Sequence, residues 1–240
     1  MQLAGKTILL TGGTDGIGKE LAHQLRAKGA TVIVTGRNAE RIAAAKRDGF
    51  EVIAADLSLP KGIDDVIDGL GSCTPDILIN NAGAGSDHDF REAAPDLADN
   101  DHCIFLNLNA PIHLIARMLP SLRARPEAMI VNVTSGLAIA PRAGGPVYCA
   151  TKAALRSYTQ ALRVQLAGTK VHVLEALPPV VETKLTAGRG NNKMAPAECA
   201  RQIVVAMERN ADEANVGLVK LLQLVHSMSP ALARKIMLRF

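Results

Sequence analysis

The sequence predicts an α/β fold with one doubly wound, mostly parallel β-sheet and helices on both faces. Short apolar runs of strand length alternate from end to end with segments of helical periodicity. The chain has 240 residues, of which 48% are hydrophobic and 21% charged, and this suits one globular domain. We find no internal repeat and no linker, so residues 1–240 are expected to form a single domain. The predicted strands are Lys6–Leu10, Thr31–Thr35, Phe50–Ala55, Asp76–Ile79, Ala128–Val133 and Lys170–Leu177.

The predicted helices lie between these strands, where apolar residues recur at helical spacing. The segment 184–195 is rich in Gly and Asn and is expected to be a mobile loop, a candidate lid over the site. The helices are expected at 19–28, 61–70, 101–122, 146–166 and 196–208, with further helical segments after Val216.

A glycine-rich turn joins the first predicted strand to the first helix. Residues 11–18 read TGGTDGIG, and a strand, a glycine-rich turn and a helix form the context of a Rossmann-type dinucleotide site. Gly12 and Gly16 would let the backbone approach a pyrophosphate, whereas Gly18 would allow close packing of helix on strand. A turn of this kind without a ligand is the alternative. The residues expected to contact the cofactor here are Gly12, Thr14, Asp15, Gly16, Ile17 and Gly18.

The end of the second predicted strand indicates which nicotinamide cofactor is bound. Folds that prefer NAD usually place Asp or Glu here to bind the ribose 2′-hydroxyl. This chain has Arg37 instead, with Arg41 one helical turn later, and guanidinium groups suit a 2′-phosphate. We therefore expect NADP(H) to be favoured over NAD(H), although solvated arginines would give the same pattern. Asp56 and Leu57 follow the third strand, where the carboxylate could reach the adenine amine.

Asn80-Asn81-Ala82-Gly83 follows the fourth predicted strand. Asparagine side chains can tie neighbouring backbone segments together, and the small residues leave room for a cofactor. An ordinary Asx turn explains the pattern equally well. We expect Asn81, Ala82 and Gly83 to contact the cofactor.

Tyr148 and Lys152 lie four residues apart in a predicted helix, so the phenol and the ammonium group share one face. A free tyrosine has a pKa of about 10, and a nearby ammonium group lowers it toward neutral pH. Ser135 follows the fifth predicted strand, at the sheet edge where α/β proteins bind ligands. Taken alone, the pair is more typical of a half-buried tyrosine beside a solvated lysine, because such pairs are common at helical spacing. With Ser135 and the glycine-rich turn, it indicates acid–base chemistry beside a cofactor.

Charge and composition exclude several other classes of protein. The net charge is +4, and residues 214–240 hold four basic residues and no acidic one, so the rest of the chain is balanced. A basic face for nucleic acid is therefore not indicated. The four cysteines and six histidines lack metal-ligand spacing, so we expect free thiols, no metal and a cytoplasmic protein. The N-terminal region lacks the plan of a signal peptide.

The motifs TGxxxGIG, NNAG and YxxxK occur in this order, with Asn107 and Ser135 between the last two. In this combination, residues 1 to about 210 resemble the short-chain dehydrogenase/reductase superfamily, and within it the DltE-like branch of uncharacterised oxidoreductases. The resemblance implies that Tyr148 is the general acid/base, and that Lys152 lowers its pKa and binds the nicotinamide ribose. It also implies that Ser135 polarises the substrate carbonyl, and that Asn107 holds a water molecule linking Lys152 to solvent.

The resemblance further implies that the turn after the sixth predicted strand lies against the nicotinamide, with Pro178, Val181 and Thr183 in contact. Thr183 would bind the carboxamide. Pro179 departs from the family, because most members have glycine there; proline removes an N–H group and stiffens the turn.

The C-terminus departs further from the family. We expect it to lack the usual glycine-ending strand and to carry an apolar, basic helical tail instead, residues 214–240. Leu232, Ile236 and Phe240 share one helical face there. The tail is expected to pack on the domain or across a dimer; contact with a membrane surface or a lipid-like substrate is the alternative.

Taken together, the sequence predicts a short-chain dehydrogenase that interconverts a small or medium, mostly apolar carbonyl compound and its alcohol by hydride transfer with NADP(H). We expect a homo-oligomer and favour a dimer. The alternative, from a different class of protein, is a non-catalytic NADP(H)-binding sensor or scaffold that acts through the basic tail.

Overall fold

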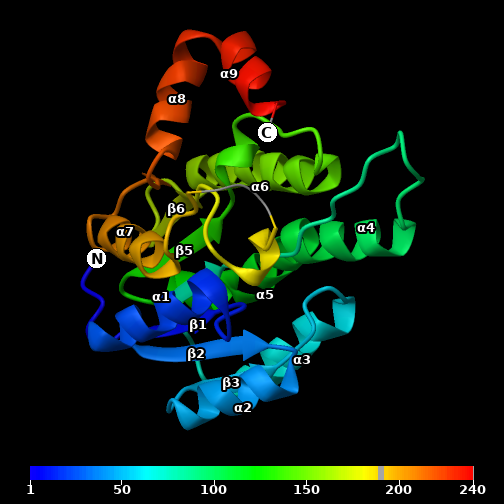
Figure 1. The fold of residues 1–240 in the computed structure, drawn as a ribbon. Helices are drawn as coiled ribbons and strands as arrows, with labels where there is room; N and C mark the ends of the chain where they lie inside the picture. Colours follow the sequence, from blue (N-terminus) through cyan, green and yellow to red (C-terminus); the bar gives the residue numbers. More distant parts are fainter. Residues whose placement is uncertain (189–191, 240) are drawn as a thin grey trace.

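A parallel β-sheet runs through the centre of the protein (Figure 1). The computed structural model describes residues 1–188 and 192–239. Within them, seven strands pair in the order β3-β2-β1-β4-β5-β6-β7, and each neighbouring pair is parallel. The predicted doubly wound α/β fold is therefore confirmed. The strands are β1 (Thr7–Leu10), β2 (Thr31–Gly36), β3 (Glu51–Ala54), β4 (Ile77–Asn80), β5 (Ala128–Val133), β6 (Val171–Leu177) and β7 (Glu213–Asn215).

Helices cover both faces of the sheet, and a set of buried apolar side chains lies between the sheet and each helical layer. The helices are α1 (Gly16–Ala27), α2 (Ala39–Arg47), α3 (Pro60–Leu70), α4 (Leu97–Ile104), α5 (Ala110–Ala124), α6 (Pro146–Gln165), α7 (Pro196–Glu208), α8 (Val219–Met228) and α9 (Pro230–Met237). Helices α1 and α7 pack on one face, whereas α3, α5 and α6 pack on the other. Successive strand residues such as Ile8 and Leu9 therefore belong to opposite halves of the core.

The strand order reverses between β1 and β4. From β1 the chain moves outward through β2 and β3, and it returns to β4 before moving outward on the other side. Connections that leave neighbouring strands toward opposite faces open a crevice at the carboxyl ends of those strands. The glycine-rich turn after β1 and the Asn80–Gly83 segment after β4 meet at this crevice, and Ser135 follows the neighbouring strand β5.

The helix predicted at 101–122 starts earlier and is interrupted. The structure has α4 up to Ile104, a π-helical turn over Phe105–Asn109, and then α5. A π-turn widens a helix by one residue, and such turns are frequent at functional sites. By length and composition alone, Leu97–Ala124 could cross a bilayer. Its α5 part packs into the core, however, and this accounts for the apolar character of that part.

The expectation that the C-terminus lacks a glycine-ending strand was wrong. β7 pairs with β6, and Gly217 follows two residues after its end. The strand has only three residues, Glu-Ala-Asn, which are poor strand formers, so only pairing with β6 reveals it. The predicted helical tail follows as α8 and α9; Phe240 lies outside the described residues.

The predicted loop at 184–195 contains a short 3-10 helix, Lys184–Thr186. A bridge joins Met194, near the end of the loop, to Val181, which lies three residues before its start. Residues 189–191 of this loop lie outside the described residues.

Candidate active site

The glycine-rich turn is packed so closely that side chains are excluded from it. A Cβ on Gly12, which has a φ of +64°, would lie 2.9 Å from Cα of Ala82. A Cβ on Gly18 would lie 2.2 Å from the carbonyl oxygen of Gly12 and 2.5 Å from Nδ2 of Asn81. The turn and the segment after β4 are therefore in direct contact, and Gly18 allows the close packing that was predicted for it.

Thr11 joins the same two segments. Its hydroxyl oxygen accepts hydrogen bonds from the backbone N–H of Asn81 at 2.9 Å and of Ala82 at 3.0 Å. The Asn81 side chain donates to the carbonyl oxygen of Thr11 at 2.9 Å. Thr11 was not among the predicted site residues, although its place directly before Gly12 in the motif could have indicated it.

Ser135 lies directly after Thr134 at the carboxyl end of β5 and is mostly buried. Its Oγ caps the short helix that follows, because it accepts a hydrogen bond from the backbone N–H of Leu137 at 3.1 Å. Gly136 donates its N–H to the carbonyl oxygen of Pro178 at 2.9 Å. The hydroxyl oxygen is thereby held in place while its hydrogen can be donated to a substrate.

Tyr148 and Lys152 lie on α6 as predicted, but the lysine is not solvated. Its Nζ lies 5.8 Å from the centre of the Tyr148 ring, and the side chain is buried. It donates a hydrogen bond to the carbonyl oxygen of Val133 at 2.9 Å. Burial lowers the pKa of Lys152 from 10.5 to about 8. A lysine held in this way can place a positive charge beside a phenol.

Asn107 occupies the π-turn and holds the segment after β4 next to Lys152. Its side chain donates to the carbonyl oxygen of Ala84 at 2.8 Å and accepts from the N–H of the same residue at 3.0 Å. It also donates to Oγ1 of Thr151 at 3.2 Å, and Thr151 donates to the carbonyl oxygen of Tyr148 at 2.8 Å. This network connects the π-turn to the helix that carries the tyrosine.

A cleft at the carboxyl edge of the sheet brings Ser135, Tyr148 and Lys152 together with part of the predicted cofactor site, whereas Asn107 and Gly16 do not line it. Thr183 closes one side of it, since a Cβ on Gly16 would lie 3.1 Å from its methyl group. Gly12, Thr14, Asp15, Gly18 and Ala82 do not line the cleft itself; Gly12, Gly18 and Ala82 pack directly behind it. The lining residues are Ile17, Asn81, Gly83, Val133, Thr134, Ser135, Tyr148, Lys152, Pro178, Pro179, Val181, Thr183, Leu185 and Thr186.

The arginines predicted to bind a 2′-phosphate lie outside this cleft, beyond the glycine-rich turn, and each pairs with an acid. Arg37 lies 3.2 Å from the carboxylate of Asp56, and Arg41 lies 2.8 Å from that of Asp15. Burial raises the pKa of Asp56, but hydrogen bonds from Ser58 and Arg37 outweigh this and keep it below the usual value. These side chains are partly exposed, so both guanidinium groups can turn to an anion. The Leu57 side chain is buried in the core.

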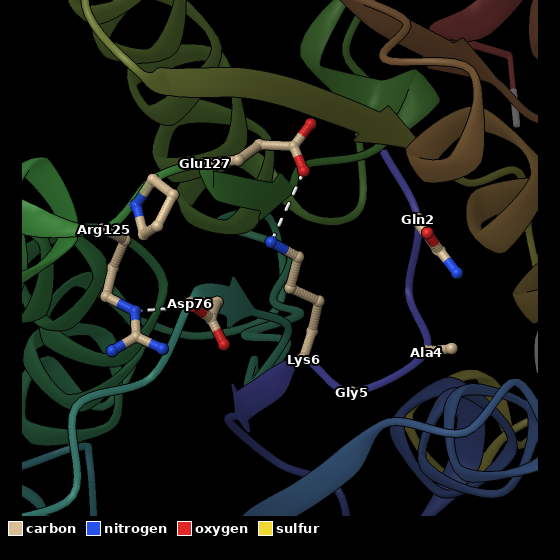
Figure 2. A pocket seen from close by; sticks show the side chains of 8 residues that line it. Gln2, Ala4, Gly5, Lys6, Asp76, Arg125 and Glu127 are labelled. Carbon is tan, nitrogen blue, oxygen red and sulfur yellow. Dashed lines mark hydrogen bonds and ion pairs between the residues drawn. The ribbon is translucent and has the colours of Figure 1, made fainter.

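A larger hollow, of about 400 Å³, lies near the N-terminus (Figure 2). Ion pairs join Lys6 to Glu127 and Arg125 to Asp76 at its wall. It lies at the amino ends of the strands, opposite to the edge where α/β sheets bind ligands, so we place the active site in the smaller cleft. Within residues 1–188 and 192–239, no three His, Cys, Asp or Glu side chains are grouped to hold a metal ion.

A buried ion pair supports the strand end that carries Ser135. Glu175 in β6 is fully buried; one of its oxygens accepts from the hydroxyl of Thr134 and the other from Arg156, both at 2.7 Å. Arg156 also reaches Glu213 in β7 at 3.0 Å. Burial raises the pKa of Glu175, although Thr134 and Arg156 act against it. Sequence reasoning missed this group, because residues so far apart carry no local signal.

Comparison with known proteins identifies relatives along most of the chain. A family model described as short chain dehydrogenase matches residues 6–194. The uncharacterized oxidoreductase DltE of Bacillus subtilis is 42% identical over 189 residues, which are 77% of this chain and 75% of that protein.

Solved structures share the fold. A short chain dehydrogenase from Burkholderia cenocepacia, in complex with NADP, aligns with a TM-score of 0.88 over 99% of both chains at 24% identity. L-Sorbose reductase from Gluconobacter frateurii, in complex with NADPH and L-sorbose, aligns with a TM-score of 0.77 at 27% identity, over 89% of this chain and 95% of that one.

Proposed function

The chain belongs to the short-chain dehydrogenase family, and we propose that it interconverts a carbonyl and an alcohol with NADP(H), using Tyr148 as general acid/base. It is an oxidoreductase of CH–OH and C=O groups, and its DltE-like character agrees with the sequence motifs. The observation that carries the proposal is the Tyr148 ring within 5.8 Å of the buried Lys152 ammonium, in a cleft shared with Ser135.

Tyr148 transfers the proton. In reduction its O–H donates to the substrate carbonyl oxygen, and in oxidation the phenolate takes the proton back from the alcohol. The phenolate is stabilised by the Lys152 charge, which is weakly screened because the lysine side chain is buried. The Ser135 hydroxyl donates a second hydrogen bond to the same oxygen and polarises the carbonyl. Asn107 keeps the Ala84 backbone beside Lys152, and we propose that it holds a water molecule that returns protons to the site.

The cleft and the turn behind it fit a dinucleotide. Side chains are excluded at Gly12 and Gly18, which leaves the backbone there open to a ligand. Gly83 lies near Lys152, since a Cβ on Gly83 would be 3.6 Å from Nζ of Lys152. When bound, the nicotinamide supplies or accepts the hydride. Asn81 and Thr183 line the nicotinamide end of the cleft, and Thr183 is the residue proposed to bind the carboxamide.

The proposed preference for NADP(H) rests on Arg37 and Arg41, which can exchange their partners Asp56 and Asp15 for a phosphate. It is supported by two structural relatives, which were solved with NADP or NADPH. We propose a small or medium, mostly apolar substrate, because Val133, Pro179 and Leu185 line the cleft beside the catalytic residues. We also propose a cytoplasmic homodimer; the four cysteines, all among the described residues, form no disulfide.

The chain offers a matched pair of substitutions to test the role of Tyr148. Tyr148→Phe removes the hydroxyl group from the cleft, whereas Tyr158→Phe removes the only other tyrosine hydroxyl from the same helix. We expect Tyr148→Phe to lower kcat by a factor of about 100 or more, with NADPH binding nearly unchanged. Tyr158→Phe should keep wild-type turnover. NADPH oxidation with a panel of aldehydes and ketones measures kcat, and turnover retained by Tyr148→Phe would refute the assigned role.

The second candidate function, a sensor or scaffold, is favoured by the apolar and basic surface of α8 and α9. Such a protein would bind NADPH without oxidising it in the presence of any carbonyl compound in the panel. NADPH binding, followed by fluorescence, together with the turnover assay separates the two functions.

A further inference from the structure

The C-terminal hairpin, residues 218–239, exposes an unusually apolar surface. It stands off from the sheet and its helical layers (Figure 1). Leu218 is 76% exposed and Met228 is 79% exposed. Its other exposed large apolar side chains are Leu221, Leu224, Leu232, Ile236 and Leu238. So many within one short segment is typical of a surface that binds a partner.

The hairpin is anchored on the domain at its base. A Cβ on Gly136 would lie 2.9 Å from Val219 and 3.7 Å from Leu222, so these two residues pack on the turn that follows Ser135. The exposed leucines therefore lie on the outward side of α8, away from this contact.

The charge of the hairpin restricts what can bind it. Lys220, Arg234, Lys235 and Arg239 are exposed, and residues 214–240 contain no acid. Two hairpins packed on each other would bring eight basic side chains together, and the repulsion between like charges would oppose that contact. The surface that covers the hairpin must therefore be both apolar and acidic.

The same chain carries a surface of this kind, which we call the acidic segment, residues 86–104. Phe90 is 72% exposed and Leu97 is 71% exposed, and Ile104 lies two helical turns after Leu97 on the same side of α4. The described chain therefore leaves the Phe90 and Leu97 side chains largely uncovered, whereas Ser86, Asn100 and Cys103 of the segment are buried. Arg91 is its one Lys or Arg residue. Its acids are Asp87, Asp89, Glu92, Asp96, Asp99 and Asp101.

We propose that the C-terminal hairpin binds the acidic segment of a second copy of the chain. A two-fold axis lets both copies exchange this contact, so that two apolar, oppositely charged surfaces are covered at once. An anionic membrane would match the hairpin but would leave the acidic segment with its phenylalanine and leucine in water. The acidic segment follows Gly83, which lines the active-site cleft, and Ala84, which is hydrogen-bonded to Asn107. The contact does not depend on the proposed catalytic function.

Charge reversal on both surfaces tests the contact. The variants are R234E/K235E on the hairpin, D99K/D101K on the acidic segment, and the combination of all four. Sedimentation equilibrium measures the dimer dissociation constant of the full chain. We expect each double variant to raise it by about tenfold or more, and the fourfold variant to restore most of the wild-type affinity. Reversal of two exposed basic residues on α2, K46E/R47E, is the matched control and should leave it unchanged.

Three results would overturn the proposal. In the first, the wild-type protein stays monomeric. In the second, R234E/K235E has a dimer dissociation constant within twofold of the wild-type value. The third is a fourfold variant that dimerises no better than the double variants. Co-sedimentation with vesicles of phosphatidylcholine and phosphatidylglycerol identifies the membrane alternative: R234E/K235E would then abolish vesicle binding while dimerisation stays unchanged. Circular dichroism establishes that each variant is folded.

Discussion

Replacing Lys152 by methionine should change how the stability of the protein depends on pH. Below pH 8 the lysine is charged in both the folded and the unfolded chain, so the folded state bears the full cost of a buried charge. Because the pKa is about 8 in the folded state and 10.5 in the unfolded state, the unfolded chain binds more protons between these values. The wild type should therefore gain stability relative to Lys152→Met as the pH rises.

The size of this gain follows from the lowered pKa. A pKa lowered from 10.5 to about 8 corresponds to about 3 kcal/mol over that pH range. Lys152→Met also loses the hydrogen bond to Val133, but both the charged and the neutral amine can donate this bond, so its loss is expected to vary little with pH. Urea unfolding at half-unit steps from pH 7 to pH 10.5 measures the free energy of unfolding of both proteins.

The exposed Lys170 provides the control, and Lys170→Met should keep the pH profile of the wild type. The test compares the free energy of unfolding of the wild type with that of Lys152→Met. If the wild type does not gain stability relative to the variant as the pH rises, burial does not lower the pKa of Lys152. The proposed electrostatic role of this lysine would then lose its basis, whatever the activity of the variant.

Three further substitutions test other parts of the site. Gly18→Ala should destabilise the protein by about 1–3 kcal/mol in urea unfolding, because its Cβ would lie 2.2 Å from the Gly12 carbonyl oxygen. Arg156→Leu should lower the free energy of unfolding by about 3–5 kcal/mol, since it leaves the carboxylate of Glu175 buried without its cation. Arg156→Lys keeps the charge and is the control; an Arg156→Leu protein as stable as Arg156→Lys would contradict this. Arg37→Asp should shift the ratio of kcat/KM for NADPH over NADH toward NADH, and an unchanged ratio would place the phosphate elsewhere.

Much of the site could be predicted because its motifs are short and local. The spacing of Tyr148 and Lys152 places both on one helical face, and the glycine-rich turn identifies the strand and helix on either side of it. The prediction of one helix at 101–122 was less accurate, because the structure has α4, a π-helical turn and α5 there. The contacts of Asn107 with Ala84 and Thr151, which accompany its π-turn, join residues 23 and 44 positions apart in the chain.

The sequence by itself determined the order of strands and helices, the edge at which the chemistry-bearing residues meet, and the residue types available for proton transfer. These follow from hydrophobic periodicity, glycine spacing and the rule that parallel strands end at a common edge. Only the tertiary structure decided that Lys152 is buried, that Glu175 pairs with Arg156 beneath Ser135, and that the tail adds β7 before α8 and α9. Each of these depends on segments distant in the chain excluding water from one another, and no local pattern of residues encodes that.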